Sequence, residues 1–225
     1  MTIHYKDVVP WGRNFDEYVR MFALSEADLQ SRILGCGDGP ASFNVECNQH
    51  GGSVTSIDPL YRFSYAEIEK RIAETFDDVI KQTRAHQENF VWDAISSPDE
   101  LGEIRMQAMR RFLDSFEAGL LSKRYIPGEL PDLPFADQTF DIALSSHFLF
   151  LYTDNLSFDF HVKSIYEMLR VAREARIFPL LDVNARESSY LSGILDEFQK
   201  YKPKVCRVNY EFQRNGNQML VLQND

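Results

Sequence analysis

A glycine-rich segment and a single acid downstream of it are the part of the sequence best suited to chemistry. Residues 35–39 read Gly-Cys-Gly-Asp-Gly and directly follow a short apolar run. Glycines let a backbone approach a ligand closely, and a helix that starts behind them offers free N–H groups. Asp58 stands nineteen residues after Gly39, at the end of the β-branched run 53–57. An acid there can accept hydrogen bonds from both hydroxyls of a ribose, so the spacing predicts a nucleoside site.

The residue after the glycines disfavours a dinucleotide. The fingerprint G-x-G-x-x-G would need a glycine at position 40, where this chain has Pro40. Proline is accepted at a first helical position, but it lacks the N–H that a pyrophosphate would use. A nicotinamide-dependent oxidoreductase is therefore the less favoured interpretation.

The elements that must position these residues alternate along the chain. Short apolar runs predict strands at 32–34, 53–57, 125–126, 140–146 and 175–183. Helical periodicity predicts helices at 14–24, 41–49, 64–86, 97–118, 159–173 and 188–200. Two last strands, 205–212 and 218–222, flank Asn215-Gly216, a strong hairpin signal. The pattern predicts an α/β, Rossmann-like three-layer sandwich, mostly parallel, with a C-terminal antiparallel hairpin strand.

The long interval between the second and third strands predicts an insertion. About 60 residues lie there, roughly twice what a plain crossover needs. Ser97 and Glu100 fit a capping box, with Pro98 at the first helical position. We expect one domain over residues 1–225, with 62–124 as a helical insertion that forms a lid. Core packing is the plainer interpretation of the apolar stripes on its two helices, and residues 10–15 are placed to close the other side.

Several segments together resemble a known family. Residues 33–39 resemble motif I of the class I S-adenosylmethionine-dependent methyltransferases, and residues 56–58, Ser-Ile-Asp, resemble the second motif. Residues 128–141 are similar to the stretch that joins the third strand to the fourth, and residues 145–147, Ser-Ser-His, to the end of the fourth. The resemblance covers roughly residues 30–60 and 125–185. It implies S-adenosylmethionine as cofactor and methyl transfer as activity.

The resemblance also implies roles for individual residues at the first two strands. Gly35, Gly37 and Gly39 would surround the methionine part of the cofactor, Asp58 would hold the ribose hydroxyls, and Leu60 would flank the adenine.

Further roles fall on the third and fourth strands. Glu129 would accept from the adenine amino group, and Leu130 would donate its backbone N–H. Ser145 and Ser146 would lie near the transferable methyl. His147 is our candidate catalytic residue, a general base at a strand end, and a packed histidine that positions the loop is the alternative.

One position departs from the family pattern. The family usually has an acid two residues before the first glycine, and counting back from Gly35 places Ile33 there. Arg13 and Asp38 are the residues that can reshape this end of the site.

Composition narrows the partners. The formal net charge of -10 disfavours nucleic acid. Three cysteines without a C-x-x-C pair and five scattered histidines indicate neither disulfides nor a metal site. The sequence shows no export signal and no membrane span, so we expect a cytoplasmic protein. We predict methyl transfer to a small-molecule acceptor. The alternative is a non-catalytic methyltransferase-like module that acts through a protein partner, and the acceptor and oligomeric state stay open.

Overall fold

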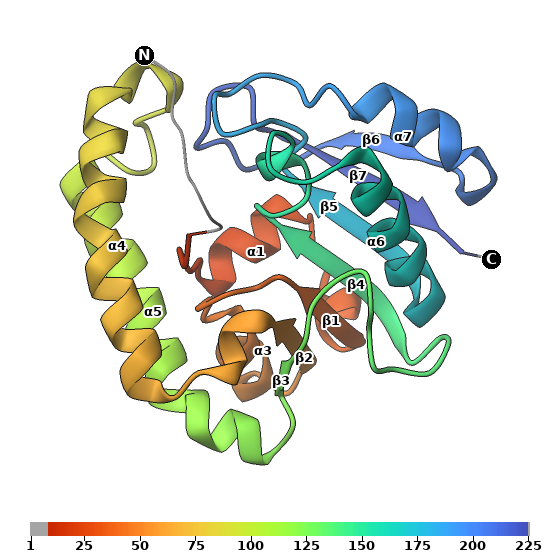
Figure 1. Cartoon of the computed structure of the whole chain (residues 1–225), viewed down its shortest axis with the longest axis horizontal. Helices are drawn as coiled ribbons and strands as arrows, with labels where there is room; N and C mark the ends of the chain where they lie inside the picture. The colour runs from red at the N-terminus through yellow and green to blue at the C-terminus, as the bar shows by residue number, and fades with distance from the viewer. Residues whose placement is uncertain (1–8, 225) are drawn as a thin grey trace.

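The structure, a computed structural model, describes residues 9–224 and is built on one seven-stranded sheet (Figure 1). The strand order is β3-β2-β1-β4-β5-β7-β6. Pairs β1·β2, β2·β3, β1·β4 and β4·β5 are parallel, and β7 runs antiparallel to both β5 and β6. The predicted fold class, including the final antiparallel strand, is confirmed.

The strands lie close to their predicted positions. They are β1 Arg32–Cys36, β2 Ser53–Asp58, β3 Tyr125–Pro127, β4 Phe140–Ser146, β5 Ala172–Phe178, β6 Lys204–Arg207 and β7 Gln218–Gln223. The prediction for β5 was too late by several residues, because the strand ends at Phe178 before Pro179, which has no N–H for the ladder.

The main helices also match their predicted places. They are α1 Phe15–Met21, α2 Glu26–Leu29, α3 Phe43–Gln49, α4 Tyr65–Ala85, α5 Pro98–Leu121, α6 Phe158–Val171 and α7 Leu191–Glu197, with four short 3-10 turns. Pro40 was expected at the start of a helix but lies three residues before α3, in a turn. The predicted capping box at the start of α5 is only half formed, because the Glu100 carboxylate bonds to Ser96 and not to Ser97. Ser97 Oγ accepts from the Glu100 N–H at 3.1 Å, while the Glu100 carboxylate accepts from the Ser96 N–H at 2.7 Å.

Alternation along the strands divides the core into two layers. On β1, Leu34 and Cys36 pack in the cluster that contains α6 and α7, whereas Ile33 packs in the cluster that contains α1 and α3. This period of two places helices on both faces of the sheet, which gives the three layers.

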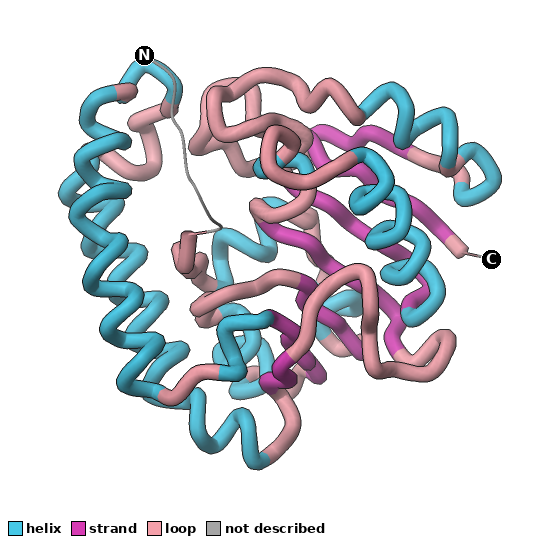
Figure 2. Tube along the Cα trace, in the orientation of Figure 1, coloured by secondary structure: helices cyan, strands magenta, loops and turns pink. Residues whose placement is uncertain are grey.

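The helices between β2 and β3 form an antiparallel pair beside the sheet. Figure 2 shows α4 and α5 standing together at the edge of the molecule. Met109, Phe112 and Phe116 of α5 pack with Tyr61 and Tyr125 in a third core cluster. The turn between the two helices is held as well, because the Val91 N–H donates to the Phe212 carbonyl at 2.7 Å and the Arg214 N–H to the Asn89 carbonyl at 2.8 Å. Residues 62–124 are thus attached to the domain at both ends of the helix pair.

Candidate functional site

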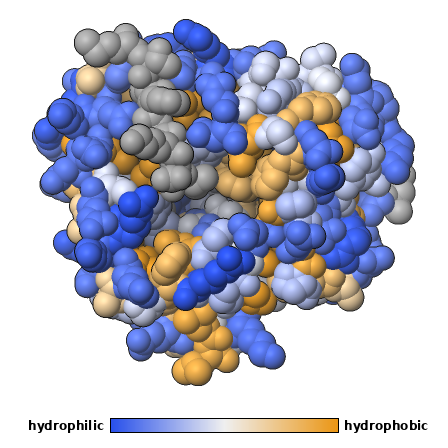
Figure 3. All heavy atoms as spheres, in the orientation of Figure 1, coloured by the Kyte–Doolittle hydropathy of each residue, from blue (hydrophilic) through white to orange (hydrophobic). Residues whose placement is uncertain are grey.

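A cavity of about 830 Å³ opens at the carboxyl ends of β1, β2 and β4. The strand order reverses between β1 and β4, and ligands of open parallel sheets bind at such a switch point. Helices α4 and α5 and residues 9–13 form the opposite wall. Figure 3 shows apolar atoms gathered toward the middle of this face, with hydrophilic atoms around the rim.

Eight of the predicted site residues line this cavity, and two do not. Those that line it are Gly37, Gly39, Asp58, Leu60, Glu129, Leu130, Ser146 and His147. Gly35 and Ser145 are buried behind the lining.

Two of the three glycines in the loop adopt a backbone conformation that favours glycine. Gly37 has φ +71° and Gly39 φ +54°, the left-handed region that favours glycine. The Gly37 N–H donates to the Ile57 carbonyl at 2.9 Å, which ties the loop to β2. A side chain at Gly37 would also stand 3.0 Å from the Phe148 ring. The backbone is therefore exposed to the cavity at this turn.

Gly35 makes room for a carboxylate of its own chain. A Cβ at this position would lie 1.8 Å from Asp38 Oδ2, so the Asp38 side chain fills the space that a residue 35 side chain would take. Ile33, which stands two residues before Gly35, is a core residue with no exposed surface, so it offers no polar group to the cavity.

Asp38 is a buried acid within the glycine loop. Its Oδ1 accepts from the Tyr18 hydroxyl at 2.8 Å and its Oδ2 from the Ser56 hydroxyl at 2.6 Å. Burial raises the pKa of Asp38 to about 6, and the negative charge of Asp58 adds to the rise. Asp38 thus presents a held, partly desolvated carboxylate to the cavity.

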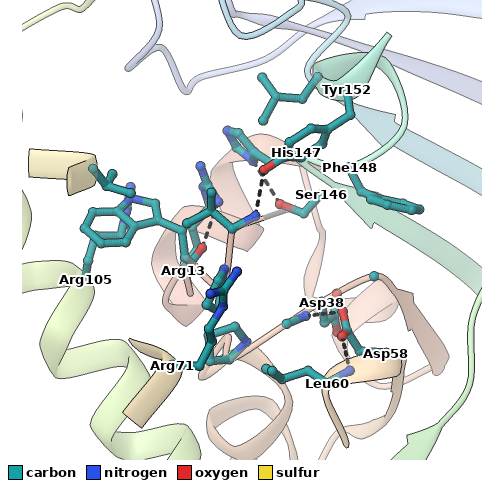
Figure 4. A pocket seen from close by; sticks show the side chains of 18 of the residues that line it. Arg13, Asp38, Asp58, Leu60, Arg71, Arg105, Ser146, His147, Phe148 and Tyr152 are labelled. Atoms are coloured by element: carbon teal, nitrogen blue, oxygen red, sulfur yellow. Dashed lines mark hydrogen bonds between the residues drawn. The ribbon is translucent and has the colours of Figure 1, made fainter. Parts of the chain in front are cut away.

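Asp58 lies across the glycine loop at the end of β2. Its Oδ2 accepts from the Gly39 N–H at 2.8 Å and its Oδ1 from the Leu60 N–H at 2.7 Å. Burial raises its pKa to about 6, against these two hydrogen bonds. A carboxylate has about four acceptor positions, so two remain for hydroxyl groups in the cavity (Figure 4).

The loop after β3 forms the rim beside Asp58. Glu129 is exposed and pairs with Arg62 at 3.1 Å. Leu130 is buried, and with Leu60 it lines the apolar part of the cavity next to the two carboxylates.

The end of β4 places Ser146 and His147 at the cavity, whereas Ser145 is fully buried and its hydroxyl has no partner within residues 9–224. Successive side chains of a strand point to opposite faces of the sheet, so only one of two adjacent serines can face the cavity. Here that serine is Ser146. His147 has φ +52°, and its N–H donates to the Phe178 carbonyl at 2.6 Å. This sharp turn directs the ring toward the cavity.

The imidazole of His147 is electrostatically disfavoured as a cation. A hydrogen bond of 3.0 Å joins its Nδ1 and the Ser146 hydroxyl. Burial, with the positive charges of Arg13 and Arg105, holds the pKa of His147 well below its usual range. The ring is therefore neutral at pH 7, and the same causes make it a weak base.

The wall opposite the two aspartates carries buried positive charge that sequence reasoning missed in part. Arg105 of α5 pairs with Glu17 of α1 at 2.5 Å, and both side chains are buried. The Tyr210 hydroxyl donates to the other Glu17 oxygen at 2.8 Å. Arg105 lies on the stripe with Leu101 and Phe112, and a charge on an apolar stripe is the signal that could have found it.

Neither a metal centre nor a membrane helix is found in the part of the chain that the structure describes. No group of three His, Cys, Asp or Glu side chains there could hold a metal ion. No helix among residues 9–224 is long and apolar enough to cross a membrane.

Comparison with other proteins gives one close relative and several distant folds. No protein-family model matches the sequence. The uncharacterized protein MJ0045 of Methanocaldococcus jannaschii is 37% identical over 221 residues, which cover 98% of this chain and 98% of that protein.

Three solved structures are similar at low identity. Magnesium protoporphyrin IX methyltransferase from Synechocystis PCC 6803, with bound SAM, is 10% identical (89% of this chain, 73% of that chain, TM-score 0.45). A SAM-dependent methyltransferase from Thermotoga maritima, a possible histamine N-methyltransferase, is 13% identical (92% and 86%, TM-score 0.44). A SAM-dependent methyltransferase from Aquifex aeolicus is 14% identical (92% and 90%, TM-score 0.42). At these TM-scores the fold class rests on the strand order of this chain itself.

Proposed function

We propose that this chain, which belongs to the same family as the uncharacterized protein MJ0045 of Methanocaldococcus jannaschii, binds S-adenosylmethionine and transfers its methyl group. The observation that carries the proposal is the position of Asp58. Its carboxylate is fixed by the N–H groups of Gly39 and Leu60 at the switch point of the sheet, with acceptor positions left for a ribose.

Other cavity residues are assigned to the adenine and to the amino-acid part of the cofactor. The apolar side chains of Leu60 and Leu130 are placed to flank the adenine, with Glu129 on the rim as acceptor for its amino group. Asp38 takes the role of the missing acid at the amino-acid end. It can accept from the cofactor's amino group as well as from Tyr18 and Ser56. Gly35 and Ser145 support these groups from behind the cavity.

For methyl transfer the protein has mainly to align the acceptor with the methyl group and to exclude water. The cofactor supplies a methyl group that its sulfonium already activates for displacement. Phe148 and Leu151 line the cavity beyond the glycine loop and keep water from that region. We assign His147 as the group that takes a proton from the acceptor, since its neutral ring lies at the end of β4.

Calorimetry tests the proposal directly. We expect S-adenosylhomocysteine and S-adenosylmethionine to bind one site per chain, and NADH not to bind. Failure of both sulfur ligands to bind would overturn the proposed function. Binding with no turnover across a panel of acceptors would favour the non-catalytic module that acts through a protein partner.

Cofactor affinity is expected to fall as the pH is lowered through about 6. The pKa of Asp58 is raised to about 6, and that of Asp38 likewise, so both carboxyls gain protons well above their usual range. A protonated Asp58 loses the charge that strengthens hydrogen bonds from ribose hydroxyls. One pH unit below the pKa about a tenth of the carboxyl stays ionised, so S-adenosylhomocysteine should bind about tenfold more weakly at pH 5 than at pH 7.5. Asp58→Asn should reduce this dependence to the part that Asp38 contributes. Equal wild-type affinities at both pH values would contradict the role.

The same shift has the opposite sign for the ligand-free fold. A carboxyl whose folded pKa lies above its unfolded value stabilises the fold below the unfolded pKa, near 4, and loses that contribution as the pH rises through about 6. These two aspartates therefore destabilise the empty protein at neutral pH.

An exchange between positions 35 and 38 tests whether a side chain at Gly35 would take the space of the Asp38 carboxylate. Gly35→Asp alone should abolish S-adenosylhomocysteine binding and lower the melting temperature, because its Cβ lies 1.8 Å from the Asp38 carboxylate. The exchange Gly35→Asp with Asp38→Gly should restore both. Asp38→Gly alone should bind weakly, which is the matched control. Wild-type affinity in Gly35→Asp alone would show that the two positions do not share one space.

A further inference from the structure

The wall of the cavity opposite Asp38 and Asp58 holds two guanidinium groups and one carboxylate. Figure 4 shows Arg13 and Arg105 on one side of the pocket and the two aspartates on the other. Glu17 neutralises Arg105 and also accepts from Tyr210. No carboxylate of residues 9–224 lies within ion-pair distance of Arg13. The region therefore carries one positive charge in excess.

Arg13 is held in place but left unsatisfied. Its backbone carbonyl accepts from the Ser42 N–H at 3.0 Å, and one terminal nitrogen donates to the Trp11 carbonyl at 3.1 Å. Its Nε is buried and has no partner among the described residues. Burying a charge without a partner costs several kcal/mol, so a ligand that brings an anion to this wall relieves that cost.

The surroundings of Arg13 define the rest of the ligand. Apolar side chains line much of the cavity, namely Val79, Phe90, Leu101, Leu151, Leu156 and Phe160. Two lining acids on α4, Glu67 and Glu74, are engaged by Ser64 and Lys70 and do not neutralise Arg13. Arg71 of α4 also lines the cavity but is exposed to solvent, so Arg13 supplies the buried positive charge of a largely apolar chamber.

We propose that the methyl acceptor is a small anion, a carboxylate or phosphate on an apolar body, and that Arg13 pairs with its charge. The proposal rests on the proposed methyl transfer and names the acceptor class of that site. The excess charge lies near the ring assigned to take the acceptor's proton, since Arg13 and Arg105 both depress the pKa of His147. The anion of the acceptor would bind between them. The cofactor's own carboxylate is the competing source of the same chemistry.

Calorimetry on the chain loaded with S-adenosylhomocysteine tests this with benzoate, phenyl phosphate and the neutral benzamide. We expect wild-type protein to bind at least one of the two anions about tenfold more tightly than benzamide, because the hydrogen bonds to Arg13 are charge-assisted. Arg13→Gln should remove the preference, and Arg13→Lys should keep part of it. Arg110→Gln, at an exposed arginine of α5 outside the cavity, should change nothing.

Separate outcomes overturn the proposal. No anion preference in the wild type, or a preference that survives Arg13→Gln in a folded protein, removes the anion site. Loss of S-adenosylhomocysteine affinity in Arg13→Gln with unchanged binding of 5′-methylthioadenosine, which lacks the amino-acid part, assigns Arg13 to the cofactor carboxylate. If S-adenosylhomocysteine does not bind the wild type, the proposed function fails by itself, and the benzoate and benzamide titrations of the ligand-free chain still test the anion site.

Discussion

Replacing Asp58 with alanine is expected to weaken S-adenosylhomocysteine binding about 100-fold. The carboxylate would lose charge-assisted hydrogen bonds to two ribose hydroxyls, and hydrogen bonds to charged groups contribute roughly 1.5–3 kcal/mol each. The low end for two such bonds is about 3 kcal/mol, which corresponds to a loss of slightly more than 100-fold. Calorimetry at pH 7.5, above the raised pKa of about 6, measures the full effect.

Two controls separate recognition from folding. Asp58 also accepts from the Gly39 and Leu60 N–H groups, so its removal loosens the loop as well. Asp58→Asn keeps the shape and one acceptor and should lose less affinity than alanine. Asp77→Ala, at an exposed acid of α4 outside the cavity, should bind as the wild type does. Unchanged affinity in a folded Asp58→Ala protein would refute the assignment of the ribose site.

The part of the site that sequence predicts is the part that local spacing determines. Glycines at a strand end and an acid at the end of the next strand are set by one strand-helix-strand unit, so Gly37, Gly39 and Asp58 meet as expected. Strand and helix positions follow from apolar periodicity in the same way, and they deviate only at ends such as Phe178, where local hydrogen bonding decides.

What sequence does not predict depends on contacts between distant segments or on a one-residue register. The Asp38 carboxylate fits beside β1 only because Gly35 has no side chain. Ser145 and Ser146 are adjacent and chemically alike, yet only Ser146 reaches the cavity. Glu17 and Arg105 are 88 residues apart, and no local pattern pairs them. Such pairs are visible only after the chain has folded.

Arg105→Met is expected to lower the free energy of unfolding at pH 7 by about 3–5 kcal/mol. The variant leaves the buried Glu17 carboxylate without its ion-pair partner, and breaking one side of a buried pair has a cost of this size. Chemical denaturation monitored by circular dichroism measures it. Arg105 connects α5 to α1, so the melting temperature of the α4–α5 pair should also fall in this variant.

The double variant Glu17→Gln with Arg105→Met shows whether the charge or the packing is responsible. Removing both charges should return most of the lost stability, since a neutral buried pair no longer needs compensation. The change of stability with pH is an independent test, because wild type and Arg105→Met should respond in opposite directions. In the wild type the pKa of Glu17 is lowered to about 2, chiefly by the charge of Arg105 acting against burial, so its contribution is complete above about 4.5 and is lost as the pH falls toward 2. In Arg105→Met burial dominates and raises that pKa, so this variant should gain stability as the pH falls from 7. A loss that persists unchanged in the double variant would assign the effect to the arginine's packing instead.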